Sequence, residues 1–365
     1  MNIEINLKKF QNGLRIIERV ISRNASLPIL GTVLMKTQNS SLLMSATNLE
    51  MGISYNIGAR VDKQGEIAVP ARVLSEFVNN INGEKIGISV NNKNTLQINS
   101  NNFKTNILGL PTNEFPIIPT INKSSSMVIN NRDLKQALVS VIDSASLSET
   151  RPELSGIFIN ITPINAEFAA TDSFRLAEKT VMVKSAVKKS LIVPRTTALE
   201  LIKIMDLIDE DVNLATSSNQ LFVYNDNLQF VTRLIDGHYP EYKKIIPEKF
   251  IGSVVVSKDD FEKSVRMSSV FSSNIYDMTI RVLKNNLEIK ASSSEKGEIV
   301  ANTQCLTRNE PFKFSVNYHY LLDGMKTIPT ENVIIKFTGE GSPILIQGEK
   351  MNDYVYVIMP LRNNS

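Results

Sequence analysis

Cysteine, histidine and tryptophan are nearly missing from this sequence of 365 residues. It contains one cysteine, two histidines and no tryptophan. Cys305 therefore cannot form a disulfide within the chain, and His238 and His319 leave too few ligands for a typical transition-metal site. We expect neither a metal nor a cofactor. Because low cysteine use is typical of reducing compartments, the expected location is the cytoplasm.

Long apolar runs and the short motifs of many enzymes are missing as well. No stretch approaches the roughly 18 apolar residues of a membrane-spanning helix. Residues 1–6 alternate like a strand and lack the basic and apolar regions of a signal peptide. The sequence has no phosphate-binding P-loop, no dinucleotide-binding glycine motif and no HExxH zinc motif. We therefore expect a protein that has no membrane span and no catalytic activity.

Two charged segments are the best remaining candidates for catalysis. Asp172 and Arg175 lie within 171–177, and Arg151 lies between Glu149 and Glu153. The first pair could act on a substrate or could order the turn that follows a strand. The second segment could be a carboxylate pair or a charged loop. The turn and the loop are the preferred interpretations, and an enzyme acting at 172–175 is the least favoured function.

The chain repeats itself at an interval close to 124 residues. Val69-Pro70 recurs as Val193-Pro194 (193 − 69 = 124), and Ala46-Thr47-Asn48 recurs as Ala170-Thr171-Asp172 (170 − 46 = 124). A third, fainter copy has Val316-Asn317 at 123 positions after the second proline pair (316 − 193 = 123). Units of about 120 residues can each bury a core. We expect three similar domains in series, over 1–122, 126–248 and 253–365.

Each copy predicts the same order of elements, which is typical of an α+β fold. A short strand leads into a helix, alternating strands follow, and a second helix precedes the closing strands. Six helices are expected, over 7–22, 70–81, 131–145, 194–208, 258–270 and 317–328. Pro70 and Pro194 suit the first turn of a helix, where no N–H is needed. Alternation with a period of two, as in 96–99, favours antiparallel sheets with one solvent-exposed face.

The first expected helix carries cations along one face. Its apolar residues form the opposite stripe, which predicts packing on the core: Leu7, Phe10, Leu14, Ile17 and Ile21. The cations are Lys8, Arg15, Arg19 and Arg23. Such a row suits the phosphates of DNA, although a solvated helix face is its more common meaning, and the net charge of +3 does not decide. Without base-reading motifs, any DNA binding would be independent of base sequence.

Five segments stand out in chain order: Ser26-Leu27-Pro28-Ile29-Leu30, 149–152 (ETRP), 171–177 (TDSFRLA), 236–242 (DGHYPEY) and 354–362 (YVYVIMPLR). Together they resemble the bacterial sliding clamps, the beta subunits of DNA polymerase III. The resemblance covers the whole chain and includes the triplication known for this family. It implies three domains of the DNA clamp fold, each with two helices packed on antiparallel sheets. Two chains would close head to tail into a ring of six domains, with helices lining the hole.

The resemblance also implies a function and a set of partners. Such a ring encircles duplex DNA and holds the replicative polymerase on it, as a processivity factor without catalysis of its own. The DNA-facing residues would be Lys8, Arg15, Arg19, Arg23 and Arg151. The implied partners are a second copy of the chain, double-stranded DNA, the polymerase alpha subunit, the clamp loader, and other polymerases and repair proteins.

Two protein-binding surfaces follow from the same resemblance. Ring closure would place Phe77, Ile81 and Ile107 of one chain against Val270 and Phe271 of the other, with Phe77 and Ile81 on one helix face. A pocket between the second and third domains would hold short apolar peptide motifs. Its residues would be Leu154, Thr171, Ser173, Phe174, Arg175, Leu176, Pro240, Lys244, Ile245, Val357, Met359, Pro360 and Leu361. Apolar walls and an adaptable methionine suit leucine and phenylalanine anchors.

This chain departs from the family pattern at the expected pocket. Ser173-Phe174 stands where glycine and histidine are common, and Lys244 stands where an arginine is often found, so the planar guanidinium fork is lost. These departures concern which peptides bind. A peptide-binding scaffold of the same fold that never closes on DNA is the second candidate function.

Overall fold

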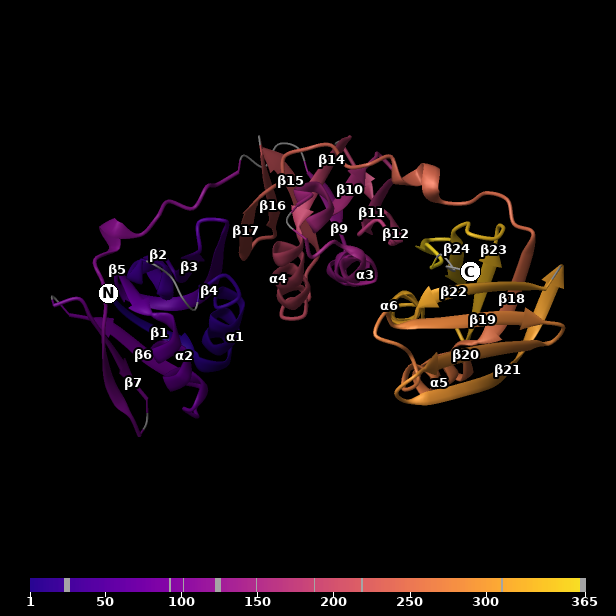
Figure 1. The fold of residues 1–365 in the computed structure, drawn as a ribbon. Coiled ribbons are helices and arrows are strands. Elements are labelled where there is room, and N and C mark those ends of the chain that lie inside the picture. Colours follow the sequence, from indigo (N-terminus) through magenta and orange to yellow (C-terminus); the bar gives the residue numbers. More distant parts are fainter. Residues whose placement is uncertain are drawn as a thin grey trace. The chain divides into compact units, whose positions relative to one another are not determined.

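The structure, a computed structural model, describes residues 1–22, 27–91, 93–100, 102–121, 126–148, 150–186, 188–217, 219–309 and 311–361. The described residues contain six α-helices and 25 strands (Figure 1), so the fold is α+β. The chain divides into two compact units. Unit 1 comprises residues 1–135, 183–187 and 196–234, and unit 2 comprises 136–182, 188–195 and 235–365.

Unit 1 contains one antiparallel sheet of 13 strands. Its path runs through β13 (Lys184–Ser185), β9 (Met127–Ile129), β15 (Val212–Ser217), β16 (Gln220–Tyr224), β17 (Leu228–Arg233), β4 (Met51–Lys63), β1 (Asn2–Asn6), β6 (Lys85–Val90), β7 (Thr95–Asn99) and β8 (Lys104–Leu108). Three further strands extend from β4: β3 (Ser41–Thr47), β2 (Thr32–Gln38) and β5 (Glu66–Pro70). The strand β8 ends the path, and its only partner among the described strands is β7.

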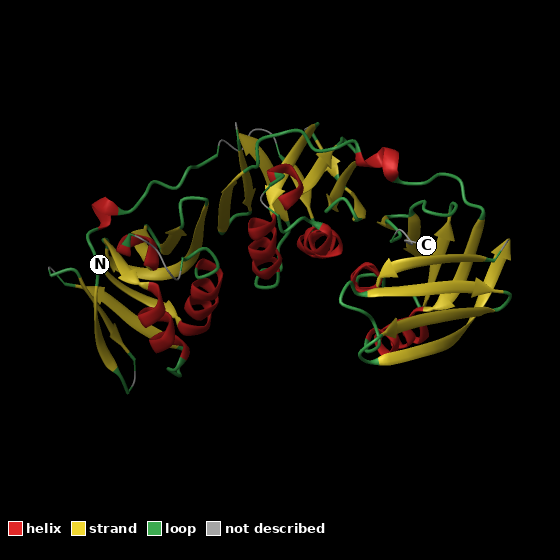
Figure 2. Cartoon of the chain, in the orientation of Figure 1, coloured by secondary structure: helices red, strands yellow, loops and turns green. Residues whose placement is uncertain are grey.

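Helix α1 (Leu7–Ile17) packs on β3 and β4 of this sheet (Figure 2). The side chain of Asn6 caps it by accepting the N–H of Lys9 at 3.1 Å. Phe10, Leu14 and Ile17 are fully buried, as their helical spacing predicts. Gly13 is buried in the same contact. A side chain at this position would clash, because its Cβ would lie 2.4 Å from the methyl group of Met44.

The first helix is shorter than its sequence predicts. It ends at Ile17, whereas the apolar pattern predicts a helix to residue 22. The N–H groups of Arg19 and Val20 bond to carbonyls three residues back, at 3.3 and 3.2 Å, so the chain tightens into turns. Arg19 therefore lies beyond the helix rather than on its cationic stripe.

The second helices also begin later and end earlier than predicted. Pro70 is the last residue of β5, paired with Thr32, and its ψ of 114° is not helical. Helix α2 (Ala71–Asn79) therefore starts after the proline, and α4 (Arg195–Met205) likewise starts after Pro194. Because α2 ends at Asn79, the prediction that Phe77 and Ile81 share one helix face is wrong.

Unit 2 contains the second antiparallel sheet, of 12 strands. Its order is β14 (Lys189–Pro194), β10 (Gly156–Ile161), β11 (Asn165–Thr171), β12 (Arg175–Met182), β25 (Tyr354–Ile358), β24 (Ile344–Gly348), β23 (Asn332–Phe337), β18 (Gly252–Ser257), β21 (Gly297–Asn309), β20 (Asn286–Ser293), β19 (Asp277–Leu283) and β22 (Phe312–Asn317). Two helices belong to it entirely: α5 (Lys258–Ser269) and α6 (Tyr318–Lys326). Residues of α3 (Asn131–Val141) and α4 fall in both units.

The three copies are joined by a recurring strand pairing. The last strand of the second copy, β17, pairs with β4 of the first copy, within unit 1. The last strand of the third copy, β25, pairs with β12 of the second copy, within unit 2. The second and third copies thus each lend their closing strand to the sheet of the copy before them.

Candidate functional site

The turn between β11 and β12 carries four of the residues expected in the peptide pocket. Asp172 Oδ1 accepts the N–H groups of Phe174 and Arg175, at 2.9 and 3.0 Å. Thr171 Oγ1 donates to the carbonyl of Arg175 at 2.7 Å. Ser173 has a φ of +78°, which favours glycine. Asp172 and Arg175 therefore order a turn, as the preferred interpretation predicted.

Arg175 is fixed from three sides. Its Nε bonds to Asp172 Oδ2 at 3.0 Å, and its Nη1 is ion-paired with Asp323 on α6. Its guanidinium also lies over the ring of Tyr320, 4.6 Å from the centroid. The side chain is only 13% exposed, so these contacts hold the β11–β12 turn against α6.

The wall below the turn is apolar and closely packed. Leu176 pairs with Val357 across β12 and β25, and both are buried. Tyr242 packs against them, together with Ala169. Thr171 and Leu154 are also buried, and Leu154 lies in a short 3₁₀ turn, Pro152–Ser155. These residues can contribute a wall but little open surface.

The rim above this wall is exposed. Phe174 is 60% exposed, and its carbonyl accepts the N–H of Met359 at 2.8 Å. Ile245 is 42% exposed, and Lys244 is exposed and ion-paired with Glu241. An exposed phenylalanine beside a methionine and a buried apolar wall is an arrangement that binds apolar side chains.

Other expected pocket residues lie on two further segments. Pro360 and Leu361 follow β25 and are half-buried, and the N–H of Leu361 bonds to the carbonyl of Ser315 at 2.7 Å. Pro240 precedes a short 3₁₀ turn, Tyr242–Ile245. The structure thus gathers the predicted residues within unit 2.

The residues that fix Arg175 are absent from the predicted pocket. Asp323 and Tyr320 lie 148 and 145 positions beyond Arg175 in the sequence (323 − 175 and 320 − 175). Tyr356 lies next to them on β25, and its burial, above all other causes, raises the pKa of its phenol. The one sequence signal for these two residues was their spacing. Asp323 follows Tyr320 by three positions on α6, which places both on one helix face.

Three family models match the chain in series. They describe the N-terminal, central and C-terminal domains of the DNA polymerase III beta subunit, and they match residues 1–119, 128–241 and 243–362. The chain belongs to the DNA polymerase III beta subunit family. Its resemblance to the bacterial sliding clamps, inferred from the sequence, is thereby confirmed.

Individual relatives agree with the family models. Proteins named beta sliding clamp from Staphylococcus epidermidis and Rickettsia felis are each 26% identical to this chain and cover 99% of it, over 99% and 100% of their own lengths. The solved sliding clamp of Bacillus subtilis has a TM-score of 0.93 at 24% identity, over 100% of this chain and 99% of that one. The solved beta subunit of Streptococcus pyogenes has a TM-score of 0.95 at 19% identity, over all of both chains. The predicted clamp fold is confirmed.

The cations that the clamp resemblance assigns to DNA differ in their surroundings. Lys8, Arg15 and Arg19 are exposed, and no described carboxylate lies within 4.0 Å of them. Arg23 lies outside the described residues. Arg151 is paired with Glu153, with 3.2 Å between Nε and Oε1, so a phosphate would have to compete with that carboxylate.

The residues that the clamp resemblance assigns to ring closure are partly buried within their own unit. In unit 1, Ile81 and Ile107 are 4% and 5% exposed, so most of their surface already packs on the core. In unit 2, Val270 is 59% exposed at the end of α5, and Phe271 lies beside Gly297 of β21. The exposed surface for a partner is therefore larger on the α5 side.

Neither a metal site nor a membrane helix is found in the described part of the chain. Within the described ranges, no group of three or more histidine, cysteine or acidic residues could hold a metal ion. No described helix is both long and apolar enough to cross a membrane. The ring of His319 packs against Tyr276, with 4.8 Å between centroids.

Proposed function

We propose that the chain is a sliding clamp of the replicative DNA polymerase and has no catalysis of its own. Two copies would close into a ring around duplex DNA, without sequence preference, in the cytoplasm. The observation that carries this proposal is the match of three beta-subunit domains, in order, along nearly the whole chain. The three domains would span 1–122, 126–248 and 253–365.

The strand pairing between copies supports head-to-tail closure. Each closing strand joins the sheet of the preceding copy, which leaves β8, the closing strand of the first copy, without such a partner among the described strands. The first half of β21, the strand of the third copy that corresponds to β4, pairs only with β20 among the described strands. Joining β8 of one chain to β21 of another would complete the series.

The repeat also predicts the register of this joint. Phe230 lies opposite Ile53 in the β17–β4 pair. When the hairpins of the copies are aligned, the equivalent residues are Thr105, which pairs with Ile98 as Phe230 pairs with Val223, and Ile299, which pairs with Ala291 as Ile53 pairs with Ala46. Ile107 would then lie opposite Gly297, which adjoins Phe271. This register brings together Ile107 and Phe271, two residues of the expected interface.

An aspartate in the joint tests ring closure. Phe271→Asp would place a charge in an apolar contact and should convert dimers to monomers in analytical ultracentrifugation. Met182→Asp, at a side chain that is 74% exposed on β12, is the matched control and should remain dimeric. An intact Phe271→Asp dimer contradicts this interface.

The exposed face of α1 supports contact with the DNA backbone. Lys8 and Arg15 project from its solvent side, and Arg19 follows in the next turn. Positive charge without base-reading groups attracts phosphates of any sequence. Replacing all three by glutamine should lower loading on DNA while leaving the dimer intact.

The peptide pocket would tether the polymerase alpha subunit, the clamp loader, and other polymerases and repair proteins. Its buried wall and exposed Phe174 support the binding of apolar anchors. Met359→Ala together with Leu361→Ala should weaken binding of a polymerase-tail peptide at least tenfold in isothermal titration calorimetry. Unchanged affinity would mean that the pocket lies elsewhere.

Retention on circular DNA tests the function as a whole. The protein is loaded by a clamp loader on nicked circular duplex DNA, washed at high salt, and measured before and after the circle is cut. A closed ring should stay on the circle and leave only the linear form. Salt-sensitive loss from both forms would contradict the ring, because phosphate binding weakens steeply with salt, and would favour the peptide-binding scaffold.

A further inference from the structure

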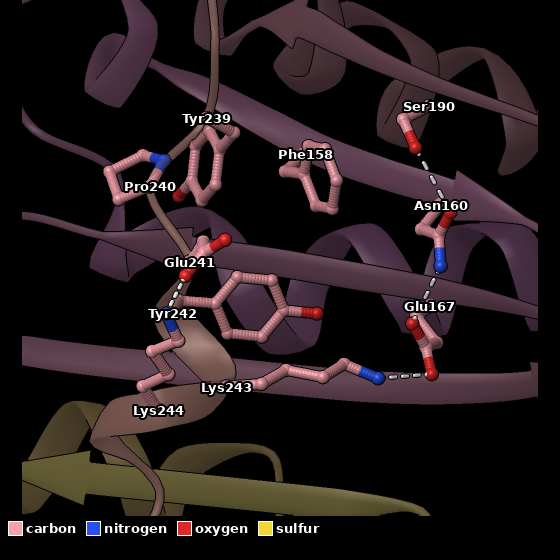
Figure 3. Close-up of a pocket in the computed structure, with 10 residues that line it drawn as sticks. All are labelled: Phe158, Asn160, Glu167, Ser190, Tyr239, Pro240, Glu241, Tyr242, Lys243 and Lys244. Carbon is pink, nitrogen blue, oxygen red and sulfur yellow. Dashed lines mark hydrogen bonds and ion pairs between the residues drawn. The ribbon is translucent and has the colours of Figure 1, made fainter.

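A cavity of about 440 Å³ lies in unit 2 beside the segment that carries Pro240 and Lys244 (Figure 3). These two residues belong to the expected peptide pocket. The lining residues on β10, β11 and β14 belong to no site described above, whereas Tyr242 also packs in the wall of the peptide pocket. A segment bound in the peptide pocket could therefore continue into this cavity.

Aromatic rings form one wall of the cavity. Phe158 and Tyr239 are stacked, with 4.8 Å between centroids and an interplanar angle of 16°. Tyr242 meets Phe158 edge-on, at 5.9 Å and 70°. Such a wall offers π faces to an apolar or a cationic group.

One carboxylate, that of Glu167, lines the opposite side, and Glu178 on the neighbouring strand faces the same cation without lining the cavity. Glu167 on β11 and Glu178 on β12 are each 14% exposed, and both face a single cation, Lys243. Lys243 is ion-paired with Glu167 and lies 3.9 Å from Glu178 Oε2. Asn160 adds a neutral contact to Glu167, with 2.9 Å between Nδ2 and Oε2. The two buried carboxylates therefore exceed the described cations that face them by one.

The rim does not supply the missing positive charge. Lys244 is already paired with Glu241, and both side chains are exposed, at 79% and 74%. Lys243 is itself 55% exposed, so it can turn toward solvent without leaving a buried charge of its own. A cation that enters the cavity can thus partly replace Lys243 as the ion-pair partner of Glu167.

Two buried oxygen atoms in this region interact with each other. They are the hydroxyl of Tyr242 and Oε2 of Glu178. Tyr242 is 3% exposed, and Figure 3 shows its hydroxyl pointing toward the side of the cavity where Glu167 lies. Burial, and then the Glu178 carboxylate, raise the pKa of Tyr242, so the phenol stays neutral. A ligand N–H group can donate to the phenol oxygen, whose own proton is directed at Glu178.

We propose that this cavity binds the guanidinium group of an arginine that flanks the apolar anchors of a docked peptide. A guanidinium offers five N–H donors, stacks on aromatic rings and carries the charge that the carboxylates lack. The cavity thereby becomes a specificity subsite of the peptide pocket. The inference rests on the proposed function, because the arginine reaches the cavity from the pocket.

Matched peptides test this subsite on the intact dimer. The probes are synthetic peptides with one leucine–phenylalanine anchor and, one to four residues away on either side, either arginine or its uncharged isostere citrulline. At the best position, arginine should bind about tenfold more tightly than citrulline in calorimetry. Glu167→Gln should remove most of that preference while retaining affinity for the citrulline peptide.

The control is a paired carboxylate in unit 1. Glu66 is ion-paired with Lys36 at 3.0 Å, and Glu66→Gln should leave the arginine preference unchanged. Should Glu167→Gln fail to fold by circular dichroism, Glu178→Gln replaces it. Anchored peptides that bind without preferring arginine would overturn this inference alone. Peptides that do not bind at all would overturn the peptide pocket as well.

Discussion

The turn after β3 and the turn after β11 have almost the same structure, yet only the second belongs to the expected peptide pocket. Thr47 Oγ1 donates to the carbonyl of Met51 at 2.8 Å, as Thr171 Oγ1 donates to that of Arg175 at 2.7 Å. Asn48 Oδ1 accepts the N–H of Met51 at 2.7 Å, as Asp172 Oδ1 accepts that of Arg175. The repeat therefore retains the turn itself, independently of any binding role.

The difference lies in the side chains that the turn presents. Met51 is a buried apolar residue, whereas Arg175 at the same place is held by two carboxylates and an aromatic ring. Asp172 in place of Asn48 adds a charge that pairs with Arg175. The two turns thus share their hydrogen bonds and differ at their second and fifth residues, of which the fifth, Arg175, contacts α6. Each prediction below changes one turn and uses the other as its reference.

Removing the guanidinium should have the largest effect. Arg175→Ala would leave Asp172 and Asp323 without their shared cation, so the free energy of unfolding should fall by about 3 kcal/mol. Arg233, which lies 3.9 Å from Glu50 beside the first turn, is 60% exposed, and Arg233→Ala should cost less than about 0.5 kcal/mol. Urea denaturation followed by circular dichroism measures both. Similar losses for the two variants would contradict the special role of Arg175.

The acidic residue separates the turn from the ion pair. Asp172→Asn keeps the acceptor for the turn but loses the charged contact with Arg175, so it should cost about 1.5 kcal/mol. The reverse change, Asn48→Asp, should stay within about 0.5 kcal/mol, because Met51 stands where a cation would have to pair with the new charge. Urea denaturation of both variants measures the two changes in the free energy of unfolding. A large effect of Asn48→Asp would show that the turn, rather than the pair, sets the difference.

The sequence predicted the repeat and the turn at Asp172, but it did not predict where α1 ends or which residue pairs with Arg175 on α6. The spacing of Thr47 and Thr171 predicted the repeat, and the preferred interpretation of Asp172 and Arg175 as turn residues is confirmed. Periodicity gave the existence of the helices but not the end of α1, because apolar residues such as Val20 continue the pattern after the backbone has left the helix. Apart from its spacing from Tyr320 on α6, nothing local indicated Asp323, since its pairing with Arg175 depends on how distant segments fold together.

The threonine hydroxyls should contribute equally in both turns. Thr47→Val and Thr171→Val each remove the hydrogen bond that the hydroxyl donates to a carbonyl and the one that it accepts from the N–H two residues on, so each should cost about 1 kcal/mol of unfolding free energy. Only Thr171→Val should also weaken binding of an anchor peptide, since only this turn borders the pocket. Denaturation and calorimetry are compared for the two variants. Unequal stability losses would mean that the turns differ in more than their exposed side chains.

The smallest effect should come from the third residue of each turn. Leu49 and Ser173 have φ values of +75° and +78°, a region that costs an L-residue more than glycine. Leu49→Gly and Ser173→Gly should therefore each raise the free energy of unfolding by about 0.5 kcal/mol. Glu50→Gly is the control, because Glu50 is not among the described residues with positive φ, and it should lower stability instead. If Ser173→Gly stabilises while Leu49→Gly does not, contacts of the Leu49 side chain outweigh the backbone strain, and the two turns are alike in geometry only.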